Sequence, residues 1–211
     1  MNNWQGALAR VRAEGPIKSV LDIGCNKCEI AGVFSAFFNT RNVMCIDANP
    51  ALLPLMKKSG FAHHVALLGN ENKDVTFYVD KNNDISTGCS IYLENTEHFN
   101  DCKKLILPMK RLDDLFADQT FDFIKIDTQG AEVDILRGGE KLVPRAKFVM
   151  LEASVRMCNF GAPDYVDVLN QMKSLGFHLY DLVSFDYYKG EMNQMDLLFK
   201  NRRADSAANA A

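Results

Sequence analysis

Four acidic residues of the chain each follow directly on a short apolar run. They are Asp22 after SVL, Asp47 after VMCI, Asp127 after FIKI and Glu152 after FVML. Such runs predict buried strands, and a carboxylate at the end of a buried strand costs free energy unless it is solvated or engaged. In a parallel sheet, ligands bind beyond the carboxyl ends of the strands. The recurrence of these acids therefore predicts a ligand-binding site at the strand ends.

The turn after the first predicted strand does not suit a nucleotide phosphate. A dinucleotide-binding turn reads GxGxxG, which lets helix amides hold a pyrophosphate. The stretch from Gly24 to Glu29 reads GCNKCE and keeps only the first glycine. The acids Asp22 and Glu29 would also repel a phosphate. A nicotinamide or flavin dinucleotide is therefore a poor fit.

A cofactor with a ribose and a cationic, phosphate-free tail fits better, and S-adenosylmethionine is the common one. Its ammonium would pair with Asp22, and its carboxylate would meet the amides of the turn from Gly24 to Asn26. Asp47 would accept hydrogen bonds from the ribose diol. Each acid has a plainer reading, as a helix cap for Asp22 and as a turn former before Pro50 for Asp47. The other expected cofactor-binding residues are those of the two turns, Gly24, Cys25 and Asn26, then Ala48 and Asn49.

Two of the six cysteines, Cys25 and Cys28, form a CxxC pair between a strand and a helix. A dithiol redox motif occurs at such a position, because a helix N-terminus lowers the pKa of a thiol. The flanking acids and the long run of further strands and helices argue against a thioredoxin-like protein. Zinc lacks a second close Cys/His pair, so we expect no metal site. The other four cysteines stand alone in the sequence and read as core fillers.

Apolar strands alternate with amphipathic helices along most of the chain. Helical spacing predicts helices at residues 3–14, 29–38, 50–59, 131–142 and 165–175, with apolar strands between them. This alternation predicts a doubly wound α/β fold, with a mostly parallel sheet covered on both faces. We expect a single domain over residues 1–201 and a mobile tail over residues 202–211. Residues 69–110 break the pattern and predict a β-hairpin insertion, with strands VTFYV and GCSIYLE, that covers the substrate.

Five stretches of the chain together resemble the FkbM family of S-adenosylmethionine-dependent methyltransferases. They are VLDIGCNKCEIAGVF, CIDANP, LDDLF with FDFIKIDTQGAEVDILRGGEKL, FVMLEAS and MDLLF. The resemblance implies a seven-stranded Rossmann-like sheet with an antiparallel last strand, and O-methylation of a hydroxyl on a sugar or natural product. By this resemblance Asp22, Gly24 and Asn26 match the family's first cofactor loop, and Asp47 matches its ribose-binding acid. Asp127, Gly130 and Glu132 match its IKID-x-x-GAE element, and of these Asp127 is expected to bind the cofactor. The family's first loop usually continues Asn-x-Gly, whereas this chain has Cys28 in place of that glycine.

Methyl transfer to an alcohol needs a group that takes the hydroxyl proton. The candidates are Asp127 and Glu152 at strand ends and His98 in the insertion. Asp127 could instead cap the helix that follows it, Glu152 could hold Arg156 or Arg137, and His98 could be an exposed loop residue. Asp127 and Glu152 could also share a hard divalent cation, although we do not predict one.

The insertion contains a dense group of polar and aromatic residues, Ser86, Ser90, Tyr92, Glu94 and His98. They could contact an acceptor or form the solvent face of a hairpin. The leading function is methylation of a small-molecule or carbohydrate hydroxyl. The alternatives are a degenerate cofactor-binding protein, which Cys28 would favour, and the less favoured dithiol redox protein.

The composition excludes several partners. The 211 residues carry 24 Lys and Arg against 27 Asp and Glu, a net charge of −3 without basic clusters, so nucleic acid and a membrane surface are not expected. No window has the roughly 18 apolar residues of a membrane span, and the first 15 residues do not have the charged-then-apolar layout that is typical of a secretory signal. We expect a cytoplasmic protein, which could form a homo-oligomer.

Overall fold

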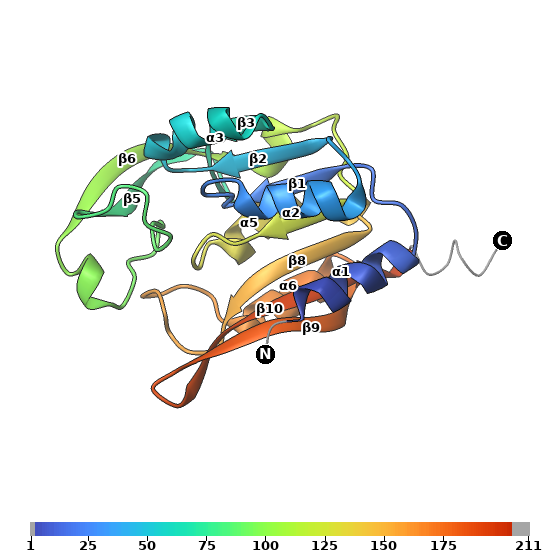
Figure 1. Ribbon diagram of the computed structural model, residues 1–211. Helices are drawn as coiled ribbons and strands as arrows, with labels where there is room; N and C mark the ends of the chain where they lie inside the picture. Colours follow the sequence, from blue (N-terminus) through green and yellow to red (C-terminus); the bar gives the residue numbers. More distant parts are fainter. Residues whose placement is uncertain (1–2, 204–211) are drawn as a thin grey trace.

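A seven-stranded sheet runs through residues 3–203, which are the residues that the computed structural model describes, apart from the side chain of His98 (Figure 1). The strand order is β3-β2-β1-β7-β8-β10-β9. The first five strands of this order are parallel, whereas β10 runs antiparallel to β8 and β9. The predicted mostly parallel sheet with an antiparallel last strand is therefore confirmed. The strands are β1 (Val20–Ile23), β2 (Val43–Asp47), β3 (Ala62–Val65), β7 (Phe123–Ile126), β8 (Phe148–Ser154), β9 (Phe177–Tyr188) and β10 (Glu191–Asn201).

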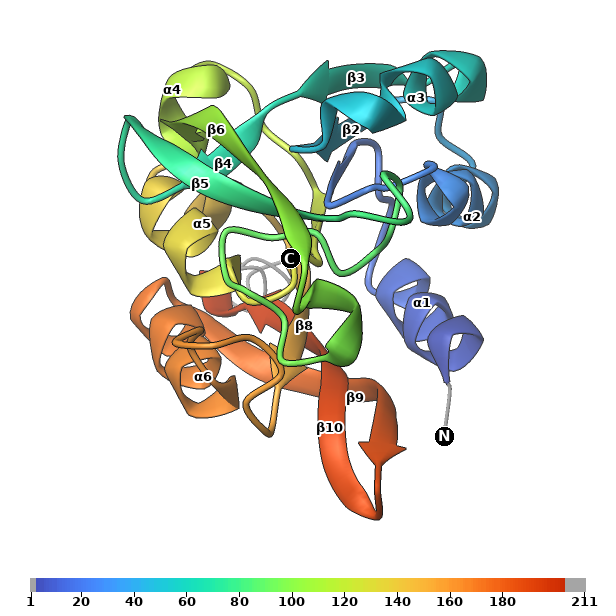
Figure 2. The ribbon, with the colours of Figure 1, turned by 90° about the vertical axis from the view of Figure 1, so that its left-hand side faces the viewer.

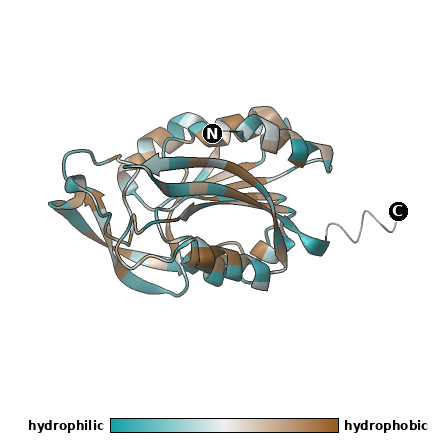
Figure 3. Ribbon diagram, turned by 90° about the horizontal axis from the view of Figure 1, so that it is seen from below, coloured by the Kyte–Doolittle hydropathy of each residue, from teal (hydrophilic) through white to brown (hydrophobic). Residues whose placement is uncertain are grey.

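Helices cover both faces of this sheet, as Figure 3 shows. Alternate residues of a strand point to opposite faces. In β7, Phe123 packs into the core under α1 and α2, and Ile124 into the core under α5 and α6. None of the helices of residues 3–203 is long and apolar enough to cross a membrane. The helices are α1 (Trp4–Ala13), α2 (Glu29–Phe38), η1 (Pro50–Leu52), α3 (Leu53–Ser59), α5 (Glu132–Gly138), η3 (Val143–Arg145) and α6 (Tyr165–Ser174).

A second, three-stranded sheet has the order β4-β6-β5, with β4 at Leu67–Gly69, β5 at Lys73–Asp80 and β6 at Cys102–Arg111. The prediction that GCSIYLE forms the second hairpin strand is wrong. The partner of β5 is β6, which pairs with it over the whole of Lys73–Asp80, whereas Ser90 makes only an isolated bridge to Tyr78. Strand β6 escaped prediction because it contains Pro108 and several lysines, which are unusual in strands.

The loop between β5 and β6 contains the 3-10 helix η2 (Glu97–Phe99), and the short helix α4 (Leu112–Leu115) follows β6. The second sheet and this loop lie on the side toward which β2 points (Figures 1 and 2). They therefore lie over the carboxyl ends of the parallel strands. Of the predicted tail, only Arg202 and Arg203 are among the described residues, and the Arg202 N–H donates to the Gly176 carbonyl at 3.1 Å.

One row of residues across the main sheet matters for the site. Asp22 pairs in register with Cys45 of β2 on one side and with Lys125 of β7 on the other. Cys45 in turn pairs with His63 of β3. Residues paired in this way project to the same face of a sheet. The row therefore places an acid, a thiol, an imidazole and an ammonium side by side on the face that α1 and α2 cover.

Candidate active site

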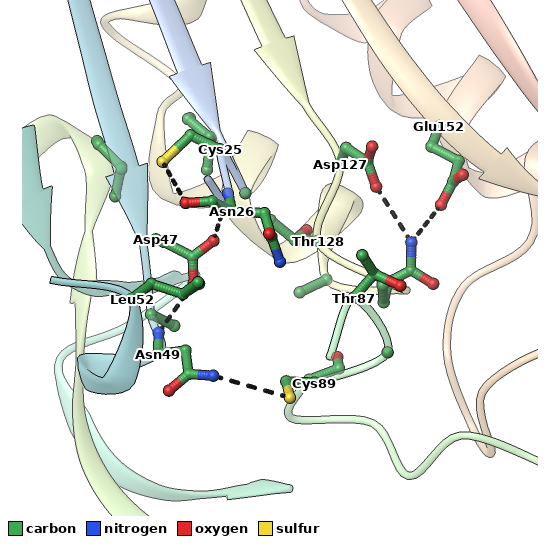
Figure 4. Close-up of a pocket in the computed structure, with 18 of the residues that line it drawn as sticks. Cys25, Asn26, Asp47, Asn49, Leu52, Thr87, Cys89, Asp127, Thr128 and Glu152 are labelled. Carbon is green, nitrogen blue, oxygen red and sulfur yellow. Dashed lines mark hydrogen bonds between the residues drawn. The ribbon is translucent and has the colours of Figure 1, made fainter. Parts of the chain in front are cut away.

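A cavity of about 750 Å³ opens at the carboxyl ends of β1, β2, β7 and β8. Figure 4 shows Asp47 and Asn49 on one side of it, Asp127 and Glu152 on the other, and Cys89 from the loop after β5. All four strand-end acids line the cavity. The structure thus brings together the predicted acids from four separate strands. A volume of this size suits a cofactor together with a small acceptor.

The first turn is built on Gly24, which has a φ of 76°. A Cβ atom added there would lie 1.7 Å from the carbonyl oxygen of Asp127, so only glycine fits. The amides of this turn are engaged within the protein, which differs from the expectation that they would hold the cofactor. The N–H groups of Gly24 and Cys25 both donate to the Ile46 carbonyl, at 2.8 and 3.0 Å. The Asn26 N–H donates to Asp47 at 2.9 Å.

Asp22 is fully buried, and neither of its carboxylate oxygens has a hydrogen-bond partner among the described residues. Burial raises its pKa from 3.8 to about 6, although the nearby Lys125 ammonium opposes the shift. Asp22 also lines the cavity. A buried carboxylate without a partner is costly, so the position suits a ligand that brings a positive charge. The plainer reading of Asp22 as a helix cap finds no hydrogen bond to support it.

Asp47 and Asn49 hold the second turn. The Asp47 carboxylate accepts hydrogen bonds from the N–H groups of Asn26 and Asn49, both at 2.9 Å, and burial raises its pKa. The Asn49 side chain accepts from the Ala51 N–H at 3.0 Å and donates to the Asp84 carbonyl at 2.6 Å. Asp47 therefore stabilises the turn before Pro50, which was its alternative role, and its side chain also lines the cavity. Ala48 lies between them and lines the same cavity.

Asp127 and Glu152 are joined by an amide side chain that the sequence did not single out. Gln129 donates from Nε2 to Asp127 at 3.1 Å and to Glu152 at 2.7 Å. Gln194 of β10 donates to the same Glu152 oxygen at 2.8 Å. Lys125 donates to Asp127 at 2.8 Å. This ammonium already neutralises Asp127, and the Gln129 amide occupies the position between the two carboxylates that a shared divalent cation would need.

The pKa values of Asp127 and Glu152 are shifted in opposite directions. Burial alone would raise the pKa of Asp127, but the charge and hydrogen bond of Lys125 and the hydrogen bond of Gln129 hold it below its usual range. The pKa of Glu152 lies well above its usual range because of burial and the negative charges of Asp127 and Glu132. Its contacts are glutamines rather than the arginines considered from sequence. Glu152 is therefore the better proton acceptor of the pair.

Glu132 and Gly130 shape the loop before α5. Glu132 accepts hydrogen bonds from the N–H groups of Thr128 at 2.7 Å and Gly130 at 3.0 Å. Burial raises its pKa to about 7. Gly130 has a φ of 104°, and an added Cβ would lie 2.7 Å from that of Ala162. Glu132, and not Asp127, thus fixes the start of the helix.

The loop from β5 to β6 contributes Ser86, Ser90 and Glu94 to the cavity wall, which is one of the two positions that the sequence left open for its polar residues. It also contributes five residues that sequence reasoning missed, Thr87, Gly88, Cys89, Ile91 and Phe99. Tyr92 instead donates from its hydroxyl to Asp134 at 2.7 Å. His98 belongs to η2, and its side chain lies outside the described residues. Gln194 could not be found from sequence, because its position depends on the antiparallel pairing of β10.

The expectation that Cys45 stands alone is wrong. Its sulfur atom and those of Cys25 and Cys28 all lie within 4.8 Å of one another. The sulfurs of Cys25 and Cys28 are 3.7 Å apart. Hydrogen bonds from Cys25 and Cys45 lower the pKa of the Cys28 thiol, and those from Cys28 and Cys45 raise that of Cys25. Register explains the cluster, because Cys45 lies beside the strand that leads into the CxxC turn.

A comparison of the sequence with family models identifies the family of the chain. The model described as the methyltransferase FkbM domain matches residues 22–179, from the first strand-end acid to β9. The chain belongs to the FkbM methyltransferase family. The matched residues contain all four strand-end acids and the whole loop between β5 and β6. A search of curated proteins found no match.

Two solved structures with a similar fold are those of methyltransferases. One is an S-adenosylmethionine-dependent methyltransferase from Clostridium acetobutylicum ATCC 824, with a TM-score of 0.54, 9% identity, and coverage of 94% of this chain and 90% of that chain. Another is the magnesium protoporphyrin IX methyltransferase ChlM from Synechocystis PCC 6803 with bound SAH, with a TM-score of 0.54, 8% identity, and coverage of 93% and 80%. These likenesses show that this FkbM chain has the Rossmann-like methyltransferase fold.

Proposed function

We propose that this protein transfers a methyl group from S-adenosylmethionine to a hydroxyl group of a small acceptor, such as a sugar. The observation that carries the proposal is the orphaned carboxylate of Asp22, which is buried beside the cavity without a hydrogen-bond partner among the described residues. S-adenosylmethionine carries an ammonium and a sulfonium, and either charge would offset the burial of this carboxylate. The membership of the FkbM methyltransferase family supports the same cofactor.

The residues of β1 and β2 form the half of the cavity that would hold the cofactor. Asp22 would pair with its cationic amino-acid end. Asp47 would accept hydrogen bonds from the ribose hydroxyls, since a carboxylate has lone pairs left after it has accepted one amide per oxygen. Leu52, Leu67 and Phe77 also line the cavity and suit an adenine ring.

The residues of β7, β8 and β10 form the half that would hold the acceptor. When bound, S-adenosylmethionine supplies a methyl group whose bond to sulfur breaks as the acceptor oxygen bonds to the carbon. Glu152 takes the hydroxyl proton, because its raised pKa makes it the stronger base. Gln129 and Gln194 hold the Glu152 carboxylate in position through two hydrogen bonds to one oxygen.

The net charge of the chain and the residues that line the cavity both support a small acceptor. The net charge of −3 gives no basic surface for a nucleic acid. The cavity wall carries Ser86, Ser90 and Glu94, which suit hydrogen bonds to a polyhydroxylated ligand. Among the solved structures of similar fold is Streptococcus pneumoniae Sp1610, a putative tRNA (m1A22) methyltransferase, at a TM-score of 0.50, 10% identity and coverage of 91% of this chain and 69% of that chain. Transfer to RNA is therefore the outcome that an acceptor screen should also test.

Calorimetry with S-adenosylmethionine and S-adenosylhomocysteine tests the cofactor half. The reduced protein should bind both compounds. Asp22→Asn should lower the affinity for S-adenosylmethionine by about 10-fold or more, since a hydrogen bond to a charged group contributes about 1.5–3 kcal/mol. Asp114→Ala is the control, because Asp114 contacts Asn72 and not the cavity. A wild-type protein that binds neither compound would refute the proposal.

Turnover tests the acceptor half. A panel of sugars and other hydroxylated compounds, with one RNA sample, is assayed for transfer of a labelled methyl group. Glu152→Gln should lower kcat by about 10²–10⁴-fold while cofactor affinity stays within about 2-fold of wild type. Equal turnover by Glu152→Gln would remove Glu152 as the base.

A second candidate function is a cofactor-binding protein without turnover. The engaged amides of residues 24–26 favour it, because they leave fewer donors for the cofactor's carboxylate. Binding of S-adenosylmethionine without methyl transfer to any acceptor class would support this candidate.

A further inference from the structure

Cys25, Cys28 and Cys45 form a compact cluster of three free thiols that the methyl-transfer proposal does not use. None of the three residues is more than 5% exposed. A tetrahedral zinc ion has Zn–S bonds of about 2.3 Å, which separates two of its sulfur ligands by about 3.8 Å. The Cys25 and Cys28 sulfurs are 3.7 Å apart, far from the roughly 2.05 Å of a disulfide. The third sulfur lies within 4.8 Å of both.

The charges around the cluster favour a cation. Asp22 is the in-register neighbour of Cys45, so its carboxylate projects from the same face of the sheet. The Asp22 and Asp47 charges both act on the Cys25 thiol. Three thiolates beside two carboxylates repel one another, and a divalent ion at the centre of the thiols would offset that repulsion.

A fourth donor can come from the neighbouring strand β3, although it is not among the atoms that already lie within 4.8 Å of one another. His63 pairs in register with Cys45 from β3, so both side chains project from one face. The His63 Nδ1 lies 2.9 Å from the Phe61 carbonyl oxygen. A carbonyl oxygen only accepts, so Nδ1 carries the proton and Nε2 keeps its lone pair. Histidine ligands of metals are held in this way, with the other ring nitrogen donating to a backbone carbonyl.

We propose that Cys25, Cys28 and Cys45 bind a soft metal ion, zinc in particular, with His63 as the fourth ligand. The ion can enter from the cavity, because Cys25 lines it. Bound there, it would fix the turn between β1 and α2 without contacting the acceptor. It also accounts for Cys28, a side chain that is retained at a φ of 62° where the family usually has glycine.

Metal binding can be measured on the whole chain without any assay of activity. The protein is purified with a reductant and a chelator, both are removed, and Zn²⁺ is titrated against a chromogenic competitor. We expect one zinc per chain. Co²⁺ as a probe should give sulfur-to-cobalt charge-transfer absorption together with the visible bands of a tetrahedral site.

Cys28→Gly is the main variant, because glycine suits the positive φ and should leave the fold intact. It should lower the affinity for zinc by more than about 10-fold and abolish the charge-transfer band. Cys45→Ser should do the same, and Cys102→Ser, at the start of β6 and outside the cluster, should behave as wild type. His63→Gln should weaken zinc by about 10-fold.

Three results would overturn the proposal. The first is a reduced wild-type protein that takes up no stoichiometric zinc. The second is a folded Cys28→Gly protein that binds zinc as tightly as wild type. The third is unchanged affinity in His63→Gln, which would overturn the assignment of the fourth ligand. Because no cofactor is present in these titrations, their failure leaves the methyl-transfer proposal standing.

Discussion

Asp22 and Asp127 are two buried acids at the ends of neighbouring parallel strands, yet their surroundings are opposite. Asp127 receives hydrogen bonds from Lys125 and Gln129, and its pKa is lowered. Asp22 has no hydrogen-bond partner among the described residues, and burial raises its pKa to about 6. The same ammonium lies in register with Asp22 but bonds only to Asp127. The protein thus neutralises Asp127 itself, whereas no described residue forms a hydrogen bond with Asp22, which fits the proposed role of Asp22 in binding a cation.

This difference separates two tasks. A paired acid stays ionised and fixes its neighbours, as Asp127 does for Gln129 and, through it, for Glu152. An unpaired acid costs stability and recovers that cost when a cation binds. Sites that bind ligands are often destabilised in this way before the ligand arrives. Under the proposed function, the half of the cavity that would hold the acceptor is thus preorganised, and the half that would hold the cofactor is completed only when the cofactor binds.

Removal of the shared ammonium should have the largest effect. Lys125→Met leaves Asp127 buried without its cation, so it would resemble Asp22, and Asp22 loses its nearest positive charge as well. We expect the free energy of unfolding at pH 7 to fall by about 3–5 kcal/mol, the usual cost of breaking a buried ion pair. Urea denaturation followed by circular dichroism measures it.

Lys147→Met is the matched control for that experiment. Lys147 pairs with Asp122 at 3.0 Å, but its side chain is 43% exposed, so the loss should stay below about 1 kcal/mol. Equal losses in the two variants would show that the Lys125 pair has no special place in the site.

Neutralisation of the unpaired acid should have the opposite sign. Asp22→Asn should raise the free energy of unfolding of the cofactor-free protein by up to about 3 kcal/mol at pH 7, the equivalent of a shift in pKa from 3.8 to about 6. The same change should lower the affinity of the protein for S-adenosylmethionine. Asp47→Ala is the contrast, because it removes the acceptor of two backbone hydrogen bonds and should destabilise the protein. A destabilised Asp22→Asn protein would show that the carboxylate is not the strained group.

The gain in Asp22→Asn should depend on pH. The folded state holds the Asp22 proton more tightly than the unfolded state, so the wild-type protein loses stability as pH rises from about 4 to about 6. Below about pH 4 both states are protonated, and the difference between wild type and variant should shrink toward zero. Denaturation at pH 4, 5, 6 and 7, with a chelator present, measures this. A difference that stays constant with pH would assign the effect to packing.

Much of the fold was predictable because its signals are local. The helix predicted at residues 29–38 is α2 from Glu29 to Phe38, and the four strand-end acids meet at one cavity. A parallel sheet brings carboxyl ends together whatever the exact register, so spacing alone predicts this meeting.

The remaining features depend on pairing between distant segments. The position of Gln194 comes from the antiparallel alignment of β10 with β8. The sulfur cluster comes from the register of β1 with β2, and the partner of β5 is a strand that contains a proline. Neither composition nor periodicity carries information on register. The sequence could therefore supply the acids but not the groups that hold them.

The smallest expected effect concerns the one loop residue that departs from the family. Cys28 has a φ of 62°, which costs a non-glycine residue roughly 1 kcal/mol. In the presence of a chelator, Cys28→Gly should therefore be as stable as wild type or up to about 1 kcal/mol more stable, although glycine loses some of this through its freer unfolded chain. With zinc in excess the order should reverse, since an ion that binds only the folded state stabilises the wild type by RT ln(1 + [Zn]/Kd). Melting curves with and without zinc measure both differences, with Cys102→Ser run beside them. If the order of wild type and Cys28→Gly is the same in both conditions, the thiol at this position stabilises the cofactor half by packing alone and not through a metal.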